Sequence, residues 1–170
     1  PRTTAPSKDE EMRKRITAHV VSAPQMILID NIVGRFGPFP SLDAAITGTE
    51  WSDRDLGFSR DINGPLRFTL FASGNNCLFM GDTARRTCHI KLESQDEKPE
   101  KRKFKIPDIR EHCRHHRGNL LGAALTILRA YFAAGRPDVK VKTWGSFEGW
   151  SSVVQSAVVF AGLPDPADTR

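Results

Sequence analysis

Two kinds of hydrophobic pattern alternate along this chain of 170 residues. Runs of consecutive apolar residues predict strands that are buried on both faces, as in the centre of a parallel sheet. The first run covers 26–30. A second, 66–73, includes β-branched and aromatic residues, and 87–92 (TCHIKL) is expected to form a third strand. Elsewhere an apolar residue recurs at every third or fourth position, which predicts helices with one buried side. We expect such helices over 8–22, 117–134 and 147–161. Two shorter helices are expected over 42–46, which Ser41 can cap, and over 108–116, where Pro107 suits the first turn.

Segments rich in glycine, proline or charge separate these elements. Residues 1–7 predict a disordered leader, and 34–40 predicts a loop because it holds two glycines and two prolines. The polar segment 51–64 predicts a hairpin or an extended loop. Strands and helices alternate in the first part of the chain, whereas the second part is helical. The order predicts an α/β core over 1–95, with a parallel sheet and flanking helices, followed by a helical, lid-like region over 96–170.

Composition places the chain among globular proteins, with 39% hydrophobic and 26% charged residues. No apolar run approaches the roughly 18 residues of a membrane span, and the polar N-terminus does not resemble a secretory signal. The three cysteines are odd in number and form no CxxC pair, so a disulfide framework is not expected. These features predict a cytoplasmic protein without a membrane partner.

One cluster contains residues that bind metals in other proteins: His112, Cys113, His115 and His116. All four lie within one predicted helical segment, and a short helix rarely supplies a closed tetrahedral shell for zinc. We therefore interpret the cluster as part of a basic helix face.

The net charge is +5, and the basic residues concentrate in 98–117. Two interpretations remain open for this segment. It is either a solvated connector followed by an exposed helix, or a surface that contacts nucleic acid. A net charge of this size permits nucleic-acid binding without requiring it.

Three polar features follow the apolar runs and suggest one chemistry. The first run ends in Asp30-Asn31, the second ends in Gly74-Asn75-Asn76, and Arg85-Arg86 follow about ten residues later. A carboxylate at a strand end can hold Mg²⁺, a nearby amide can orient water or a phosphate, and an arginine can neutralise the charge that develops on phosphoryl transfer. Each feature alone is typical of an ordinary strand end or turn, so their order and spacing carry the hypothesis.

Five separated motifs resemble the C-terminal half of helicase-like P-loop ATPases, and the resemblance covers about residues 9–168. These are MILIDNIVGRFGPFPSLDAAITGTEWSDRDLG, FASGNN, GDTARRTCHIKLES, PDIREHCRHHRGNLLGAALTILRAY and WGSFEGWSSVVQSAVVFAGLPDP. Such ATPases occur in phages, prophages and mobile elements, often beside primase–polymerase modules. The resemblance implies a partial AAA+ type core, close to the phage and superfamily-three helicases.

The resemblance assigns roles to the polar residues after the two strands. Asp30 resembles the Walker B carboxylate, which implies contacts with Mg²⁺ and ATP. Asn31 follows it at the position of the catalytic base. Asn75, together with Asn76, resembles the sensor-one residue that contacts ATP.

Further roles concern arginines. Arg85 and Arg86 resemble the arginine-finger position, which acts on the nucleotide of a neighbouring subunit. The segment 51–64 occupies the place of the hairpin that faces the pore in related hexamers, and Arg54 and Arg60 are its candidate contacts with nucleic acid. The implied whole is a ring-shaped homo-oligomer, in many relatives a hexamer, that couples ATP hydrolysis to movement on single-stranded or forked DNA.

The sequence departs from the family pattern in two ways. Asn31 stands where many AAA+ enzymes have Glu, and an amide is not a useful proton acceptor. No Gly-Lys pair occurs, so the phosphate-binding GxxxxGK[ST] loop is missing. We expect this loop upstream of Ser7, and we expect the chain alone to bind ATP poorly and to be inactive.

Other assignments remain open. The chain is alternatively a non-catalytic remnant that binds DNA or another protein. An enzyme of another class is less well supported, because the sequence contains no GxSxG or HExxH motif. In the lid-like region, Arg129 and Arg136 are possible sensor-two residues, but no motif singles one out and ordinary charges on a helix face are the favoured interpretation. Trp144 and Trp150 are expected to pack the last helix.

Overall fold

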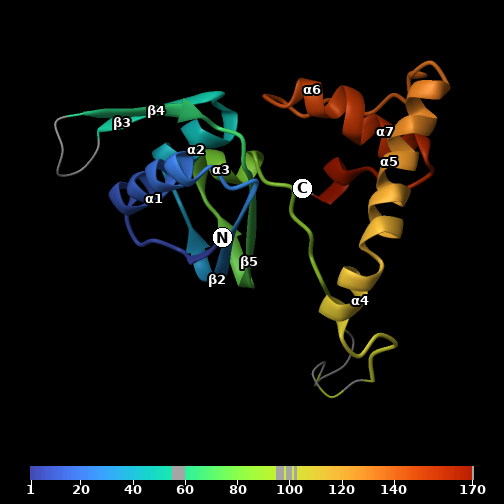
Figure 1. The fold of residues 1–170 in the computed structure, drawn as a ribbon, viewed down its shortest axis with the longest axis horizontal. Coiled ribbons are helices and arrows are strands. Elements are labelled where there is room, and N and C mark those ends of the chain that lie inside the picture. The colour runs from blue at the N-terminus through green and yellow to red at the C-terminus, as the bar shows by residue number, and fades with distance from the viewer. Residues whose placement is uncertain (55–59, 95–97, 99–100, 102, 170) are drawn as a thin grey trace. The chain divides into compact units, whose positions relative to one another are not determined.

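The computed structural model describes residues 1–54, 60–94, 98, 101 and 103–169. The chain divides into two compact units, Pro1–Thr87 and Cys88–Arg170, whereas the sequence placed a division near residue 95. Each unit is considered by itself. Figure 1 shows their elements.

The first unit contains a parallel sheet of three strands. β1 (Arg2–Thr4), β2 (Met26–Phe36) and β5 (Thr69–Phe79) lie in the order β1-β2-β5, and both neighbouring pairs are parallel. This confirms the expected α/β fold with a parallel sheet and flanking helices. The expected disordered leader is wrong, because residues 2–4 form an edge strand. Their backbone groups find hydrogen-bond partners along β2, which a local sequence pattern does not reveal.

The strand expected over 87–92 is also wrong. These residues have no regular structure, and the side chains of Ile90 and Leu92 are 75% and 92% exposed. A strand forms only where a neighbouring strand pairs with it and its apolar face is covered. Among the described residues, neither condition is met here.

Two helices cover one face of the sheet (Figure 1). They are α1 (Asp9–Ser22) and α2 (Pro40–Thr47), close to the ranges that the sequence predicts. Together with β2 they enclose the core, which consists of Met12, Ile16, Val20, Ile29, Ile32, Phe36, Phe39, Leu42 and Ala45. Asp9 joins the two helices, because its carboxylate accepts hydrogen bonds from the Ser41 backbone N–H at 3.0 Å and the Ser41 hydroxyl at 2.8 Å. Asp9 thereby caps the N-terminus of α2.

Two β-bulges set the register between β2 and β5. β2 has one extra residue between Ile29 and Ile32, and β5 has one extra residue between Asn75 and Leu78. Asn31 and Asn76 take the left-handed conformation within these bulges, with φ of 60° and 51°. The two insertions cancel, so the strands are in the original register again where they end.

The expected ends of β2 and β5 are wrong, because both strands continue through the bulges. We expected β2 to end at Asp30 and β5 to end at 74–76, with a loop over 34–40. Both strands continue instead, to Phe36 and Phe79. Glycine and asparagine are turn residues because they tolerate positive φ, and the same property suits them to bulges inside a strand.

A hairpin lies beside α1, and its strands extend one residue beyond each end of the expected range 51–64. β3 (Glu50–Arg54) and β4 (Asp61–Pro65) pair in antiparallel fashion, and the segment 55–59 between them lies outside the described residues. The Trp51 indole donates to the Thr17 hydroxyl at 3.0 Å, and that hydroxyl donates to the Asp53 carboxylate at 2.7 Å. These bonds attach the hairpin to α1.

The second unit is helical, as the sequence predicts. Its main elements are α4 (Ile109–His115), α5 (Arg117–Ala133), α6 (Glu148–Trp150), the π-helical segment Ser151–Gln155 and α7 (Ser156–Phe160). Trp144 is buried, and its ring meets that of Trp150 edge to face at 5.7 Å. None of the helices in the described part of the chain has the length and apolar character needed to cross a membrane.

Gly74 provides a test of the contact between β2 and β5. A Cβ atom at this position would overlap the carbonyl oxygen of Ile32. We expect Gly74→Ala to destabilise the first unit by about 2 kcal/mol or more, since the paired strands cannot separate without breaking backbone hydrogen bonds. Chemical unfolding followed by circular dichroism measures this free energy.

Gly122→Ala is the matched control. A Cβ there meets nothing within 4 Å, and replacing glycine inside a helix stabilises by about 0.5–1 kcal/mol. Equal effects of the two substitutions would contradict the proposed close approach of the strands.

Candidate functional site

Asp30 lies on the sheet face opposite α1 and α2. The alternation along β2 places Ile27 and Ile29 on the covered face, which leaves Asp30 on the other side. The Ser73 hydroxyl donates to one carboxylate oxygen of Asp30, and Arg2 forms an ion pair with the other. The three strands of the sheet therefore each contribute one side chain to this group. The Asp30 side chain remains 20% exposed.

These contacts favour the ionised form of Asp30. The Ser73 hydrogen bond lowers the pKa of the Asp30 carboxyl, and the positive charge of Arg2 and the Asn31 backbone N–H lower this pKa further. A carboxylate beside a serine hydroxyl is a suitable oxygen donor set for Mg²⁺, which often binds one protein carboxylate and keeps several waters. The described residues contain no group of three or more His, Cys, Asp or Glu side chains that suits a metal ion.

The three asparagines of the predicted site occupy different places. Asn31 is the bulge residue of β2. Asn75 lies opposite Val33, three residues beyond Asp30 along the sheet, and its side chain is exposed on the same open face as Ser73. Asn76 is the bulge residue of β5. Asp30 and Asn75 thus share one face of the sheet, although no hydrogen bond between them is described.

The two arginines after β5 point to different surroundings. α3 (Gly81–Arg85) follows β5 and ends between them. The Arg86 side chain is only 12% exposed and forms an ion pair with Asp82 at 2.5 Å. Its guanidinium also donates to the Asp43 carbonyl, and it donates to the Thr47 hydroxyl at 3.0 Å. Arg86 therefore fastens α2 to α3, a structural role that the sequence did not reveal.

Arg85 lies on the outer side of α3. Its side chain is 51% exposed and forms an ion pair with Asp82. A second hydrogen bond, between the buried Thr83 hydroxyl and the Asp43 carboxylate at 2.6 Å, also joins α2 and α3. Of the predicted pair, Arg85 is the residue placed to reach another molecule.

The two hairpin arginines flank the part of the hairpin that is not described. Arg54 is exposed at the end of β3 and lies opposite Asp61 in the β3–β4 register. Arg60 immediately precedes β4 and is also exposed. Both positions are compatible with contact to an external ligand.

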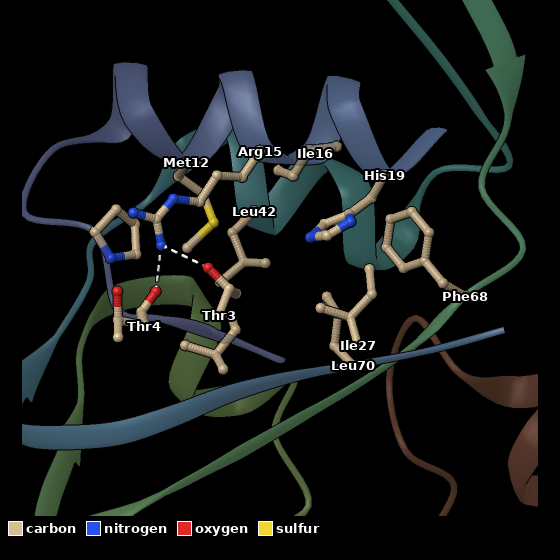
Figure 2. Close-up of a pocket in the computed structure, with 12 residues that line it drawn as sticks. Thr3, Thr4, Met12, Arg15, Ile16, His19, Ile27, Leu42, Phe68 and Leu70 are labelled. Atoms are coloured by element: carbon tan, nitrogen blue, oxygen red, sulfur yellow. Dashed lines mark hydrogen bonds between the residues drawn. The ribbon is translucent and has the colours of Figure 1, made fainter. Parts of the chain in front are cut away.

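A small cavity lies between α1 and the covered face of the sheet (Figure 2). Arg15 lies at one end of the cavity and donates to the Thr3 hydroxyl at 2.9 Å and to the Thr4 carbonyl. At the other end His19 faces Phe68, with ring centroids 6.5 Å apart, and burial lowers the pKa of the His19 imidazole. The cavity volume is about 10 Å³, which holds no more than about one water molecule. It therefore cannot admit a nucleotide.

The second unit contains a larger, open hollow of about 710 Å³. Arg136 lies in its wall, donates to the Ser152 carbonyl at 3.3 Å and stands 5.3 Å from the centre of the Phe132 ring. Arg129 is exposed on α5. These positions do not distinguish the two as nucleotide sensors.

Comparisons with protein-family models, with curated proteins and with solved structures found no match to this chain. The ATPase resemblance therefore remains a prediction from the sequence motifs.

The hydrogen bond from Ser73 to Asp30 can be tested by titration. We expect Ser73→Ala to raise the pKa of the Asp30 carboxyl towards the usual value of about 3.9, because the carboxylate loses a donor. A lowered native pKa stabilises the fold above the unfolded-state pKa, and this contribution disappears as the pH falls through the native pKa. Carbon-detected NMR titration measures the shift. Thr69→Ala on the same strand is the control, and an unchanged Asp30 pKa in Ser73→Ala would contradict the contact.

The contrast between the two arginines gives another prediction. Arg86→Ala should lower the free energy of unfolding by about 1–3 kcal/mol, because it removes the charged donor that joins the Asp43 carbonyl and the Thr47 hydroxyl of α2 to the end of α3. Arg85→Ala should change this free energy by no more than about 0.5 kcal/mol, as expected for an exposed ion pair. Chemical unfolding of both variants provides the comparison, and a reversed order would show that the inward and outward assignments are wrong.

Proposed function

We propose that this chain is part of an ATP-dependent DNA helicase or primase-helicase of the AAA+ type, of phage or mobile-element origin. One observation carries the proposal. Two neighbouring parallel strands display Asp30 and Asn75 on the same open sheet face, and the helix after the second strand displays Arg85. This is the combination of carboxylate, amide and arginine that phosphoryl transfer uses.

Each side chain has a distinct task in this proposal. Asp30, kept ionised by Ser73 and Arg2, binds the Mg²⁺ that neutralises phosphate charge when ATP is present. Asn75 orients the attacking water or the terminal phosphate. Arg85 reaches the nucleotide of an adjacent subunit, where its fixed positive charge stabilises the transition state. Arg54 and Arg60 contact the DNA backbone.

A specific observation also supports the second candidate, a non-catalytic module that binds DNA or protein. Both carboxylate oxygens of Asp30 already have partners within the sheet, in Ser73 and Arg2. Asn31 follows Asp30 and offers no proton acceptor in the position of a catalytic base. An Asp30 that only holds the strands together would produce the same contacts.

Subunit mixing distinguishes these candidates in the natural protein that contains this chain. We expect Asp30→Asn to reduce ATP hydrolysis by about 100-fold or more and Arg85→Ala to reduce it by about a thousandfold, as for other arginine fingers. Mixed oligomers of the two variants should regain hydrolysis, because a subunit with intact Asp30 then receives Arg85 from its neighbour.

The control is Asp138→Asn, which removes a charge outside the proposed site and should leave hydrolysis unchanged. Normal hydrolysis in Asp30→Asn would contradict the ATPase assignment. Absence of hydrolysis in the unaltered protein, together with DNA binding, would support the non-catalytic candidate.

A further inference from the structure

The positive charge of the chain is concentrated in one segment of the second unit. Residues 98–117 contain eight basic and three acidic residues, a net charge of +5, while the remaining chain contains seventeen of each sign. The whole excess charge of the protein therefore belongs to these twenty residues. A polyanion approaching the chain is attracted mainly here.

The helix in this segment presents its arginines along one side. Arg110, Arg114 and Arg117 are spaced by four and three residues, and all three are exposed. The backbone bonds from His116 to His112 and from Leu120 to His116 continue the helical pattern from α4 into α5. Residues at this spacing share a helix face, so the three guanidinium groups form one row.

Two of the three arginines have no competing carboxylate among the described residues. Arg114 forms an exposed ion pair with Glu111, and Asp108 accepts a hydrogen bond from the Glu111 backbone N–H as the cap of α4. Arg110 and Arg117 have no ion-pair partner among the described residues. An anionic ligand at this row therefore replaces at most one weak surface pair.

Apolar and aromatic side chains are interspersed with the positive charges. Phe104 lies between Lys103 and Lys105 and is 54% exposed, although aromatic rings are usually much more buried. The imidazoles of His112 and His116 lie side by side on the helix, with centroids 4.4 Å apart. Rings beside cations suit nucleic acid, because bases stack on rings while phosphates pair with cations.

We infer that a single-stranded nucleic acid binds the surface formed by Lys101, Lys103, Phe104, Lys105, Arg110, Arg114 and Arg117, which we term the α4 basic surface. Single strands fit better than duplexes, because only unpaired bases can stack on Phe104. The inference does not rest on the ATPase proposal, since binding here needs neither ATP nor Asp30.

Fluorescence anisotropy of the full chain with a labelled oligothymidylate of about 20 nucleotides tests the inference. We expect the triple variant Arg110→Gln, Arg114→Gln, Arg117→Gln to bind on the order of 100-fold more weakly at low salt. The slope of log affinity against log salt should fall by about 2, as expected when three phosphate contacts are lost on a single strand. Glutamine preserves helix propensity, and circular dichroism confirms that the variant folds.

A charge-matched control removes three exposed basic residues elsewhere, Lys8→Ala, Arg129→Ala and Lys142→Ala. It should keep the full salt slope. Equal losses in both triple variants would overturn the inference, because they would show a general effect of net charge. Unchanged binding in the Gln variant together with a loss in Arg54→Ala, Arg60→Ala would also overturn it and assign binding to the hairpin.

Phe104 separates stacking from electrostatics. Phe104→Ala and Phe104→Leu should both weaken binding by roughly tenfold with the salt slope unchanged, because the ring and not the apolar volume stacks on a base. Full affinity in both variants would contradict a nucleic-acid surface with stacking. Binding to phosphatidylserine vesicles without binding to the oligonucleotide would overturn the inference in favour of an anionic membrane.

Discussion

The close pairing of β2 with β5 is the constraint on which the first unit depends. Gly74 lets the two backbones approach, and any larger residue there would overlap Ile32. The bulge at Asn31 then keeps Ile32 in the core after the pleat has shifted by one residue. If the same residues paired without the bulge, strict alternation would turn Asn31 towards the helices and Ile32 towards the open face. The bulge therefore keeps both Asp30 on the open face and the apolar side chains under the helices.

The local elements were largely predictable, because helical periodicity and turn residues act over a few positions. The helices and the β3–β4 hairpin lie where the sequence predicts them. β1 was missed because Arg2–Thr4 has no strand pattern of its own and depends on the edge of β2. The continuation of both strands was missed because Gly and Asn have the same local signal in a turn and in a bulge.

The candidate site shows where residue type alone is insufficient. Arg85 and Arg86 are neighbours with the same chemistry, yet Arg85 is the last residue of α3 and Arg86 follows it as the C-cap. Arg86 faces the interior and holds α2, while Arg85 faces outwards. Residue type is also insufficient for Asp30, which lies within β2 and not at its end because β2 stays paired with β5 beyond this residue. Motifs indicated the candidate region, and packing decided which of its side chains remain accessible.

The distribution of ion pairs bears on how an anionic polymer meets this protein. In the first unit, several basic side chains already have carboxylate partners: Arg2 with Asp30, Arg13 with Asp53, and Arg85 with Asp82. A phosphate that binds there must displace a carboxylate, and the favourable and unfavourable terms then nearly cancel. The α4 basic surface needs no comparable exchange, because Arg110 and Arg117 face solvent without a described partner. Initial capture of nucleic acid is therefore electrostatically easier on the second unit than at the sheet.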